Sequence, residues 1–499
     1  MRSFLMAAIL CGAAVTAQGE FADYRYLPPP AAKAATGPSA MAAGVTADWK
    51  RGAMPRYEID DYAGQTAFLK QSSTHPELQV AVGADLGWTG EALFDPPALN
   101  KGRYTWQAAI GSADATALRF KVDLSGLGPD DDVWVVDLEG PVSFGPYTLA
   151  DAEGEGRWLP TTMGDTAVLV VTSPRAAMPN VTLQKLSHHY EDMVTKGTDC
   201  PISADCITNT ALREVSTGIG RMSVTDESGD SALCSGALVN NALTEAVEPF
   251  FLTADHCFQG FPATIRASGI EVLWDVRTNG CPGTEPSSQQ IAQRPRSTGT
   301  SFLTNSTSLD AMLLALGSVP VGNLGRAYLG WDTRAPRINN GAVGIHHPAG
   351  RALKECIGRV DDVGVDSSFG LGQTTIRWTE GITEGGSSGS PVMFNDGSFR
   401  IFGMLSNGNF QSCNNNNARL DQYSSFQSFF LAAGEFLNST APSLAGSATY
   451  MNTGGGGGGN GALCTLEKRT LAESAGDITL AGLSMLVLLG LGTVQRRNA

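Results

Sequence analysis

The stretch EGGSSGSP, residues 384–391, decides how this chain of 499 residues is interpreted. It places Ser388 in a Gly/Ser-rich loop that continues into the apolar residues 391–394. A second stretch upstream, FLTADHC at residues 251–257, supplies His256. A serine hydroxyl becomes an effective nucleophile when an imidazole accepts its proton and a carboxylate orients that imidazole. The two stretches therefore predict a serine nucleophile and its histidine base.

The order of these residues along the chain separates the possible folds. Residues 385–389 also fit the G-x-S-x-G nucleophile elbow, with Ser387 as nucleophile, but that fold places its histidine after the serine. The last histidine here is His347, so the elbow has no base. A subtilisin order needs an aspartate before the histidine, and no segment before His256 is typical of such a site. The order histidine, aspartate, serine remains.

The third member of the site is predicted to be Asp310. It stands at the head of the apolar run 311–316, which is short enough to be a buried strand that shields and orients a carboxylate. The backbone N–H groups of Gly386 and Ser388 are predicted to form the oxyanion hole. Glycine at position 386 lets the loop take the turn that this geometry requires.

Together these motifs resemble the lysyl endopeptidases of Gram-negative bacteria, a branch of the trypsin-like serine peptidases. The resemblance covers roughly residues 197–440 and is also carried by IHHP at 345–348 and DQY at 421–423. It implies an all-β fold, a chymotrypsin-like double β-barrel preceded by a β-sandwich pro-domain. It also implies a secreted serine endopeptidase that cleaves polypeptides after lysine, or after lysine and arginine.

The resemblance implies that Asp421 is the acid that pairs with a basic P1 side chain in the S1 pocket. The ordinary trypsin acid is missing, because the position six residues before the nucleophile is Ile382. Ser406, which stands where the family has a histidine, is assigned to the same pocket. Two alternatives stay open: a serine endopeptidase with glutamyl or apolar P1 specificity, and a non-catalytic surface-binding protein with a peptidase fold.

The cysteines fit an exported protein. No C-x-x-C pair and no H-E-x-x-H motif occurs, so we expect no metal site and no cofactor. The resemblance implies three disulfides, each contributing roughly 2–4 kcal/mol mainly by restricting the unfolded chain: Cys200–Cys413, Cys206–Cys281 and Cys234–Cys257. Cys356 is then left without a cysteine partner.

Both ends of the chain point to export. Residues 1–17 are predicted to be a signal peptide, because a basic residue, an apolar run and a small-residue site follow one another. A Gly-rich linker at 441–477 leads to an apolar segment with a basic end, residues 478–499, which resembles a C-terminal sorting signal. A plain membrane anchor is the alternative, although an apolar run of about 17 residues is at the short limit for a transmembrane helix. We expect a secreted or cell-surface protein that interacts with export and C-terminal sorting machinery and contacts the membrane through this segment.

Composition limits the partners. The formal net charge of −15 argues against binding nucleic acid. The hydrophobic content of 42% is enough to form buried apolar cores, and the length predicts about two or three domains. We expect a monomer whose partners are polypeptide substrates.

The region between the signal and the peptidase is predicted to hold a β-sandwich pro-domain at residues 95–196. Residues 118–124 alternate apolar and charged side chains, which is the pattern of a half-buried strand. Residues 18–94 are assigned to a mobile lead-in and the start of the pro-region, because their first part is rich in Ala, Gly and Pro. Lys196 lies where pro-region and peptidase meet, so self-cleavage is predicted there, which would make this protein a zymogen with Gly197 as its mature N-terminus.

Overall fold

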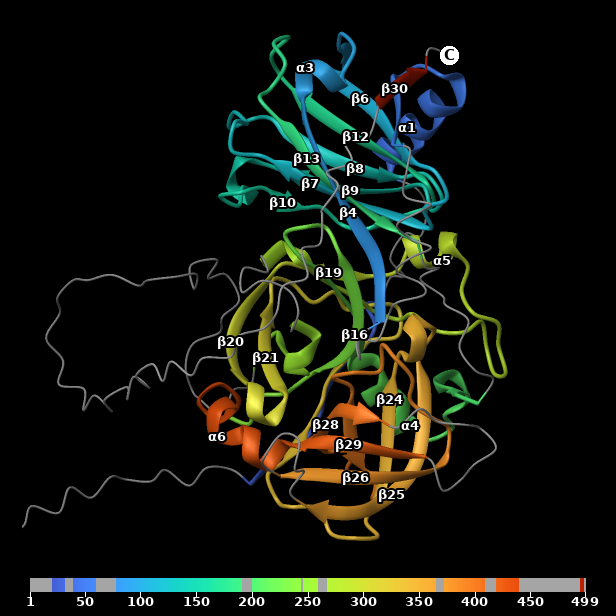
Figure 1. Ribbon diagram of the computed structural model, residues 1–499, viewed down its shortest axis with the longest axis vertical. Coiled ribbons are helices and arrows are strands. Elements are labelled where there is room, and N and C mark those ends of the chain that lie inside the picture. The colour runs from blue at the N-terminus through green and yellow to red at the C-terminus, as the bar shows by residue number, and fades with distance from the viewer. Residues whose placement is uncertain are drawn as a thin grey trace, which may run out of the picture.

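The computed structural model describes residues 20–31, 39–59, 78–190, 200–243, 246–258, 267–364, 372–408, 419–438 and 494–497. The chain forms two stacked bodies, an upper one built mainly from residues before 191 and a lower one built mainly from residues after 199 (Figure 1). The predicted signal peptide, Cys413 and the predicted cleavage site at Lys196 lie outside the described ranges.

The upper body is a sandwich of two β-sheets around an apolar core that includes Trp106, Phe120 and Leu169. One sheet contains β3 (Arg56–Ile59), β5 (Ala98–Asn100), β6 (Arg103–Ser112), β8 (Asp132–Asp137), β9 (Val142–Tyr147), β12 (Thr166–Ser173) and β30 (Val494–Arg497). The other contains β4 (Leu78–Thr89), β7 (Ala117–Asp123), β10 (Arg157–Trp158), β11 (Thr162–Met163) and β13 (Thr182–His189). Helices α1 (Ala40–Arg51) and α3 (Gly90–Leu93) and the 3₁₀ turn η1 (Leu149–Asp151) complete this body.

The sheet of the sandwich that contains β4 continues into the lower body. The first residues of β4 pair antiparallel with β16 (Ser231–Leu238), where Leu78 is opposite Leu233 and Ala81 is opposite Ser231. The remainder of β4 pairs with β13. Figure 1 shows β4 running down from the sandwich to β16. One twelve-stranded sheet therefore belongs to both bodies.

Strand β7 differs from the half-buried strand predicted for residues 118–124, and the prediction is wrong because the lower body covers the charged face. Arg119 has 0% exposure, and its guanidinium donates to the Thr225 hydroxyl at 2.7 Å and to the Gly269 carbonyl at 2.8 Å. Lys121 forms an ion pair with Glu227. A buried charge is tolerated only when its hydrogen bonds are satisfied, so these contacts fix the sandwich on the lower body.

The lower body consists of two antiparallel barrels. The first contains β15 (Ile219–Thr225), β16, β17 (Phe250–Thr253), β18 (Ile270–Leu273), β19 (Arg296–Thr298), β20 (Thr300–Ser306) and β21 (Ala311–Leu316). Its short helical elements are η2 (Ala204–Cys206), α4 (Thr210–Val215), η3 (Ser216–Gly218), η4 (Asp255–Phe258), η5 (Ala267–Gly269), α5 (Ser288–Ala292) and η6 (Thr307–Leu309). Its interior is apolar and includes Phe251, Trp274 and Leu314.

The second barrel is a closed ring in the order β24, β25, β26, β29, β28, β27 and back to β24. These strands are β24 (Gly341–His346), β25 (Lys354–Gly364), β26 (Gln373–Glu380), β27 (Pro391–Phe394), β28 (Ile401–Gly408) and β29 (Leu420–Ser425). Smaller elements flank the ring: β14 (Ile202–Ser203), β22 (Arg326–Tyr328), β23 (Trp331–Asp332), η7 (Pro348–Gly350) and α6 (Phe426–Leu437). The chain thus has the predicted all-β class and double-barrel peptidase architecture.

The lead-in expected to be mobile has regular structure in the lower body. β1 (Phe21–Ala22) pairs with β23, and β2 (Arg25–Leu27) pairs with β22. Arg400 adds an ion pair to Asp23 at 2.6 Å. A composition rich in Ala, Gly and Pro did not prevent this pairing, because the strands that complete it come from residues about 300 positions away and are invisible to local sequence reasoning.

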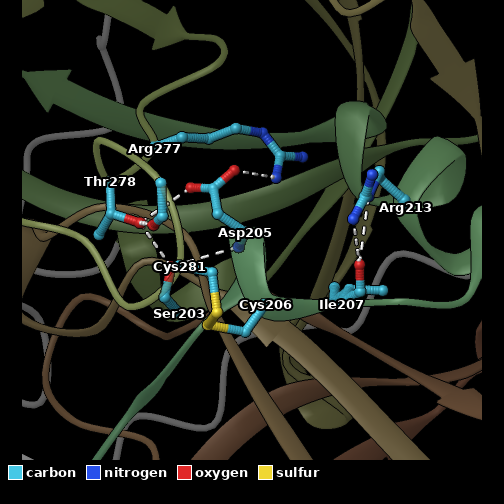
Figure 2. The surroundings of a disulfide bond; sticks show 9 residues. Ser203, Asp205, Cys206, Ile207, Arg213, Arg277, Thr278 and Cys281 are labelled. Carbon is cyan, nitrogen blue, oxygen red and sulfur yellow. Dashed lines mark hydrogen bonds and ion pairs between the residues drawn. A yellow bond between two sulfur atoms is a disulfide. The ribbon is translucent and has the colours of Figure 1, made fainter.

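Two disulfides whose four cysteines all lie in the described ranges brace the lower body. Cys206–Cys281 fastens η2 to the segment before α5, where Asp205 accepts hydrogen bonds from Thr278 at 2.9 Å and from Arg277 at 3.5 Å (Figure 2). Cys234–Cys257 joins β16 to η4. Both were implied by the family resemblance. Cys200 is also disulfide-bonded.

Within the described ranges, no helix has both the length and the apolar character needed to cross a membrane. The predicted apolar segment at 478–499 lies outside those ranges except for β30.

Candidate active site

His256 is held where β17 ends and η4 begins. The residue is 6% exposed, and the next residue, Cys257, is bonded to Cys234 of β16. The disulfide brings β16, η4 and the imidazole together, so the ring cannot move far from the first barrel.

Asp310 lies against this imidazole because β17 and β21 are adjacent antiparallel strands. Thr253 at the end of β17 is opposite Met312 near the start of β21, so the residues just beyond these strand ends meet. Asp310 Oδ2 is 2.7 Å from His256 Nδ1, and its Oδ1 accepts the His256 backbone N–H at 2.7 Å. Asp310 itself is 0% exposed and adopts a left-handed conformation with φ 49°. Both carboxylate oxygens therefore fix His256.

A further hydrogen bond reaches the same carboxylate. The Ser406 hydroxyl of β28 donates to Asp310 Oδ2 at 2.6 Å. Sequence reasoning assigned Ser406 to the S1 pocket and missed this contact, since no local pattern connects residues that are 96 positions apart.

Ser388 is anchored to the same barrel through Ser235 of β16. The Ser235 N–H donates to the Ser388 carbonyl at 2.8 Å, and the Ser235 carbonyl accepts from the Thr253 hydroxyl at 2.9 Å. Gly389, with φ +79°, lies so close to Thr253 that a Cβ there would be 2.2 Å from its hydroxyl oxygen. The loop that carries Ser388 therefore rests on the strand end that carries His256.

The Nε2 atom of His256 is placed to accept a proton. Its Nε2 is buried and has no hydrogen-bond partner among the described residues, whereas Nδ1 is occupied by Asp310. A neutral imidazole whose Nδ1–H donates to a carboxylate keeps Nε2 as an acceptor. The ring is thus prepared to accept a proton from a nearby hydroxyl.

The nucleophile loop, which we define as residues 384–388, has its carbonyls occupied, while the two amides predicted for the oxyanion hole are unused. The Gly385 carbonyl accepts from Ala349 N–H at 2.6 Å, and the Gly386 carbonyl accepts from the Ser235 hydroxyl at 2.9 Å. Across the part of the chain that the structure describes, neither the Gly386 N–H nor the Ser388 N–H has a protein acceptor. Free amides in a fixed loop are the arrangement that stabilises an oxyanion.

The His-His-Pro turn, residues 346–350, packs against this loop. His346 Nδ1 is 2.8 Å from the Ser387 hydroxyl, and its Nε2 is 3.1 Å from the Cys356 sulfur. The His347 backbone N–H donates to the Ser235 hydroxyl at 3.0 Å. Burial lowers the pKa of His346 and of His347 to about 3, so both rings are neutral at ordinary pH. The sequence singled out this motif but gave it no role.

Asp421 of β29 lies beside the segment that leads to the nucleophile loop. It is 0% exposed, and its Oδ2 accepts from the Thr383 hydroxyl at 2.7 Å and from Trp378 Nε1 at 2.5 Å. Ile382, the position of the ordinary trypsin acid, is buried and apolar. The carboxylate that the sequence assigned to S1 is therefore placed next to the chain five residues before Ser388.

Cys234, His256 and Cys257 place one ligand-type atom each within 4.8 Å of one another. The two sulfurs are already bonded to each other. A disulfide sulfur is not the thiolate that binds zinc, so this cluster reflects the brace beside His256.

Comparison with known proteins found a matching family, a related sequence and similar solved structures. Residues 194–424 match the family described as "Lysyl endopeptidase, C-terminal domain". A protein named lysyl endopeptidase from Pseudomonas aeruginosa is 29% identical over 358 residues, which cover 66% of this chain and 75% of the relative. Among solved structures, the active form of the Rv3671c protease of M. tuberculosis aligns with a TM-score of 0.33 and 12% identity, over 50% of this chain and 94% of that one. The thermostable serine protease AL20 from an extremophilic microorganism aligns with a TM-score of 0.31 and 18% identity, over 45% of this chain and 96% of that one.

The double barrel and the sequence relationship define a serine endopeptidase, a hydrolase of polypeptides. Within that class, residues 194–424 are similar to the C-terminal domain of lysyl endopeptidases.

Proposed function

We propose that this protein hydrolyses peptide bonds through a triad of His256, Asp310 and Ser388, and that it prefers lysine at P1. The observation that supports the triad most directly is the paired contact of Asp310 with His256, which leaves Nε2 without a protein partner. Nothing in this arrangement requires a metal or a cofactor.

In this mechanism Ser388 attacks the scissile carbonyl while His256 accepts its proton at Nε2. Asp310 orients the ring and stabilises the imidazolium that forms. The amides of Gly386 and Ser388 bind the oxyanion of the tetrahedral intermediate. His256 then donates the proton to the leaving amine, and water repeats the sequence on the acyl-enzyme.

The P1 preference is proposed from Asp421. A lysine ammonium that leaves water needs an opposite charge or full hydrogen bonding, and Asp421 is a buried carboxylate beside Thr383, near the nucleophile loop. The lysyl endopeptidase named above supports the same preference. Acceptance of arginine beside lysine is included in the proposal.

Mass spectrometry of cleavage sites in a denatured proteome tests this function. We expect new C-termini to end predominantly in lysine, and a fluorophosphonate probe to label the protein rapidly. The Ser388→Ala protein is the control and should show neither activity. A preference for acidic or large apolar P1 residues would refute the lysyl specificity, and absence of labelling in the unchanged protein would favour a non-catalytic binding protein.

We also propose that the chain is exported through residues 1–17, is held or sorted through residues 478–499, and acts as a monomer at the cell surface or in the medium. The sandwich is proposed to assist folding or to block the site before cleavage after Lys196. Its position supports blocking: Leu78 of β4 lies opposite Leu233, two residues before Ser235, and a Cβ on Gly385 would be 3.8 Å from the Leu78 Cβ.

N-terminal sequencing of protein recovered from cells or medium checks this maturation. We expect the sequence Gly-Thr-Asp-Cys, which begins at Gly197, because the bond after Lys196 offers the enzyme its own preferred residue. The Lys196→Gln variant should keep its N-terminal part covalently attached. If only a form that begins near Gln18 is recovered and it is fully active, the sandwich is a permanent domain.

A further inference from the structure

We propose that the His-His-Pro turn is a clamp that holds the nucleophile loop in its active form, with His346 as a positioning residue. The proposal rests on the proposed function, because the loop supplies the two oxyanion amides. Neither the sequence motifs nor the relatives assign a role to this histidine.

The first contact of the clamp fixes the residue before the nucleophile. His346 Nδ1 is 2.8 Å from the Ser387 hydroxyl, and the same hydroxyl accepts the Glu384 backbone N–H at 3.1 Å. The Ser387 N–H in turn donates to the Glu384 carbonyl at 3.0 Å. His346 therefore orients the side chain that ties the two ends of the turn before Ser388 together.

The second contact sets the direction of an oxyanion amide. Ala349 N–H of the clamp donates to the Gly385 carbonyl at 2.6 Å. In a trans peptide the N–H points opposite to the carbonyl, so the Gly386 N–H is directed away from the clamp. Gly386 has φ +87°, and a Cβ there would be 3.2 Å from the His347 carbonyl oxygen. The positive φ favours glycine at this position, and the 3.2 Å approach leaves little room for a Cβ.

The third contact passes through Ser235. Its hydroxyl accepts from the His347 N–H at 3.0 Å and donates to the Gly386 carbonyl at 2.9 Å. Consecutive peptide groups of the nucleophile loop are thus oriented by the clamp, directly or through one serine. Such preorganisation is what makes oxyanion donors effective, because they do not have to reorient during the reaction.

The clamp works without charge. Burial lowers the pKa of His346 to about 3 and raises that of Cys356, so a neutral ring lies between a thiol and a hydroxyl. A neutral imidazole donates from one nitrogen and accepts at the other, and both the Cys356 thiol and the Ser387 hydroxyl can take either role. In many trypsin-like zymogens a new N-terminal ammonium pairs with an aspartate just before the nucleophile. Ser387 occupies that position here, and His346 lies against it instead. On this proposal the loop is held by His346 and needs no new N-terminal ammonium.

Replacing His346 with asparagine or glutamine distinguishes a role in positioning Ser387 from a role in packing alone. The amide of His346→Asn reaches the place of Nδ1 and can still bond Ser387, whereas the amide of His346→Gln reaches the place of Nε2 and leaves Ser387 without its partner. We expect His346→Gln to lower kcat about 10²-fold, as loss of an oxyanion donor does, with KM changed less than about threefold. His346→Asn should retain kcat within about fivefold, because it preserves the contact with Ser387.

The discriminating readout is the ratio of affinities for a lysyl peptide aldehyde, which forms a tetrahedral adduct, and for the same peptide as an unreactive amide. We expect His346→Gln to lower this ratio about 10²-fold and His346→Asn to leave it nearly unchanged. His189→Gln is the matched control, since burial also lowers the pKa of His189 to about 3 but this histidine lies in β13 of the sandwich. It should leave the ratio and kcat unchanged.

The clamp is refuted if His346→Gln keeps kcat and the affinity ratio, or if both amide variants lose thermal stability and activity together without a change in the ratio. Should His346→Gln fail to fold, Ser387→Ala and Ser387→Thr answer the same question: alanine should lower the ratio, and threonine, which keeps the hydroxyl, should not. If the unchanged chain neither hydrolyses lysyl peptides nor reacts with a fluorophosphonate, the proposed function fails. If the unchanged chain hydrolyses lysyl peptides and reacts with a fluorophosphonate, and the variants have the same kcat and affinity ratio, only the clamp proposal fails.

Discussion

Replacing Asp310 with asparagine is expected to lower kcat about 10⁴-fold while KM changes little. The structure sets the orientation of the new amide. Oδ1 of Asp310 accepts the His256 backbone N–H, so the oxygen of the asparagine must stay there and its NH₂ must face Nδ1. An NH₂ group donates to Nδ1 and forces the proton onto Nε2. That tautomer cannot accept the Ser388 proton.

Steady-state hydrolysis of a lysyl peptide amide near pH 8 measures this effect, with thermal unfolding to confirm that the variant is folded. Ser406→Ala is a useful comparison, because it removes a hydrogen bond to Asp310 Oδ2 without changing the tautomer of His256. We expect its loss to be far smaller, roughly 10-fold, which is about 1.4 kcal/mol. Near-normal kcat in folded Asp310→Asn would mean that another carboxylate orients His256.

The second large effect is expected from Asp421→Asn, which should lower kcat/KM for lysyl substrates roughly 10²–10³-fold. Loss of one partner from a buried charge pair costs about 2–5 kcal/mol, because the other charge is left uncompensated. The amide can still accept from Thr383 through its oxygen, so the wall around position 421 should survive. Activity on a norleucine substrate, which has no charge to pair, should change little.

The ratio of kcat/KM for lysine substrates to kcat/KM for norleucine substrates therefore isolates the contribution of the charge on the P1 side chain. Asp361→Asn is the matched control, since this carboxylate of β25 pairs with Arg377 in the same barrel and should not affect the ratio. An equal loss on both substrates would show that Asp421 is structural, and the P1 pocket would then have to be sought elsewhere.

Much of the candidate site could be proposed from the sequence because its parts lie in short motifs with a fixed order. The motifs around residues 256 and 388 admit one triad order, and the apolar run after Asp310 predicted the buried strand that became β21. The contacts of Ser235, Ser406 and Ala349 were not accessible. Each depends on strands that meet only in the closed barrels, and a serine or an alanine carries no local signal of such a role.

The fold, too, could be predicted from the sequence only in part. Alternation identified strands such as β7, but period-two patterning cannot show whether the polar face meets water or another body. Arg119 and Lys121 read as solvent-facing residues, yet they are buried against Thr225 and Glu227. The pairing of β1 and β2 with β23 and β22 was missed for a related reason, since segments of two or three residues are too short to carry a pattern.

The N-terminal part of the chain contacts the peptidase at two separate places: β1 and β2 pair with β23 and β22, and β4 and β7 contact the first barrel. After a cut at Lys196 alone, this part would remain a bivalent ligand. When one contact opens, the other keeps the loose end at high effective concentration, so re-formation outpaces escape. A further cut between residues 28 and 77, where Lys33, Lys50 and Lys70 lie, would turn one bivalent ligand into two weak monovalent ones. Release of the peptidase would then depend on how many of these bonds are cut, and the first cut alone would not cause it.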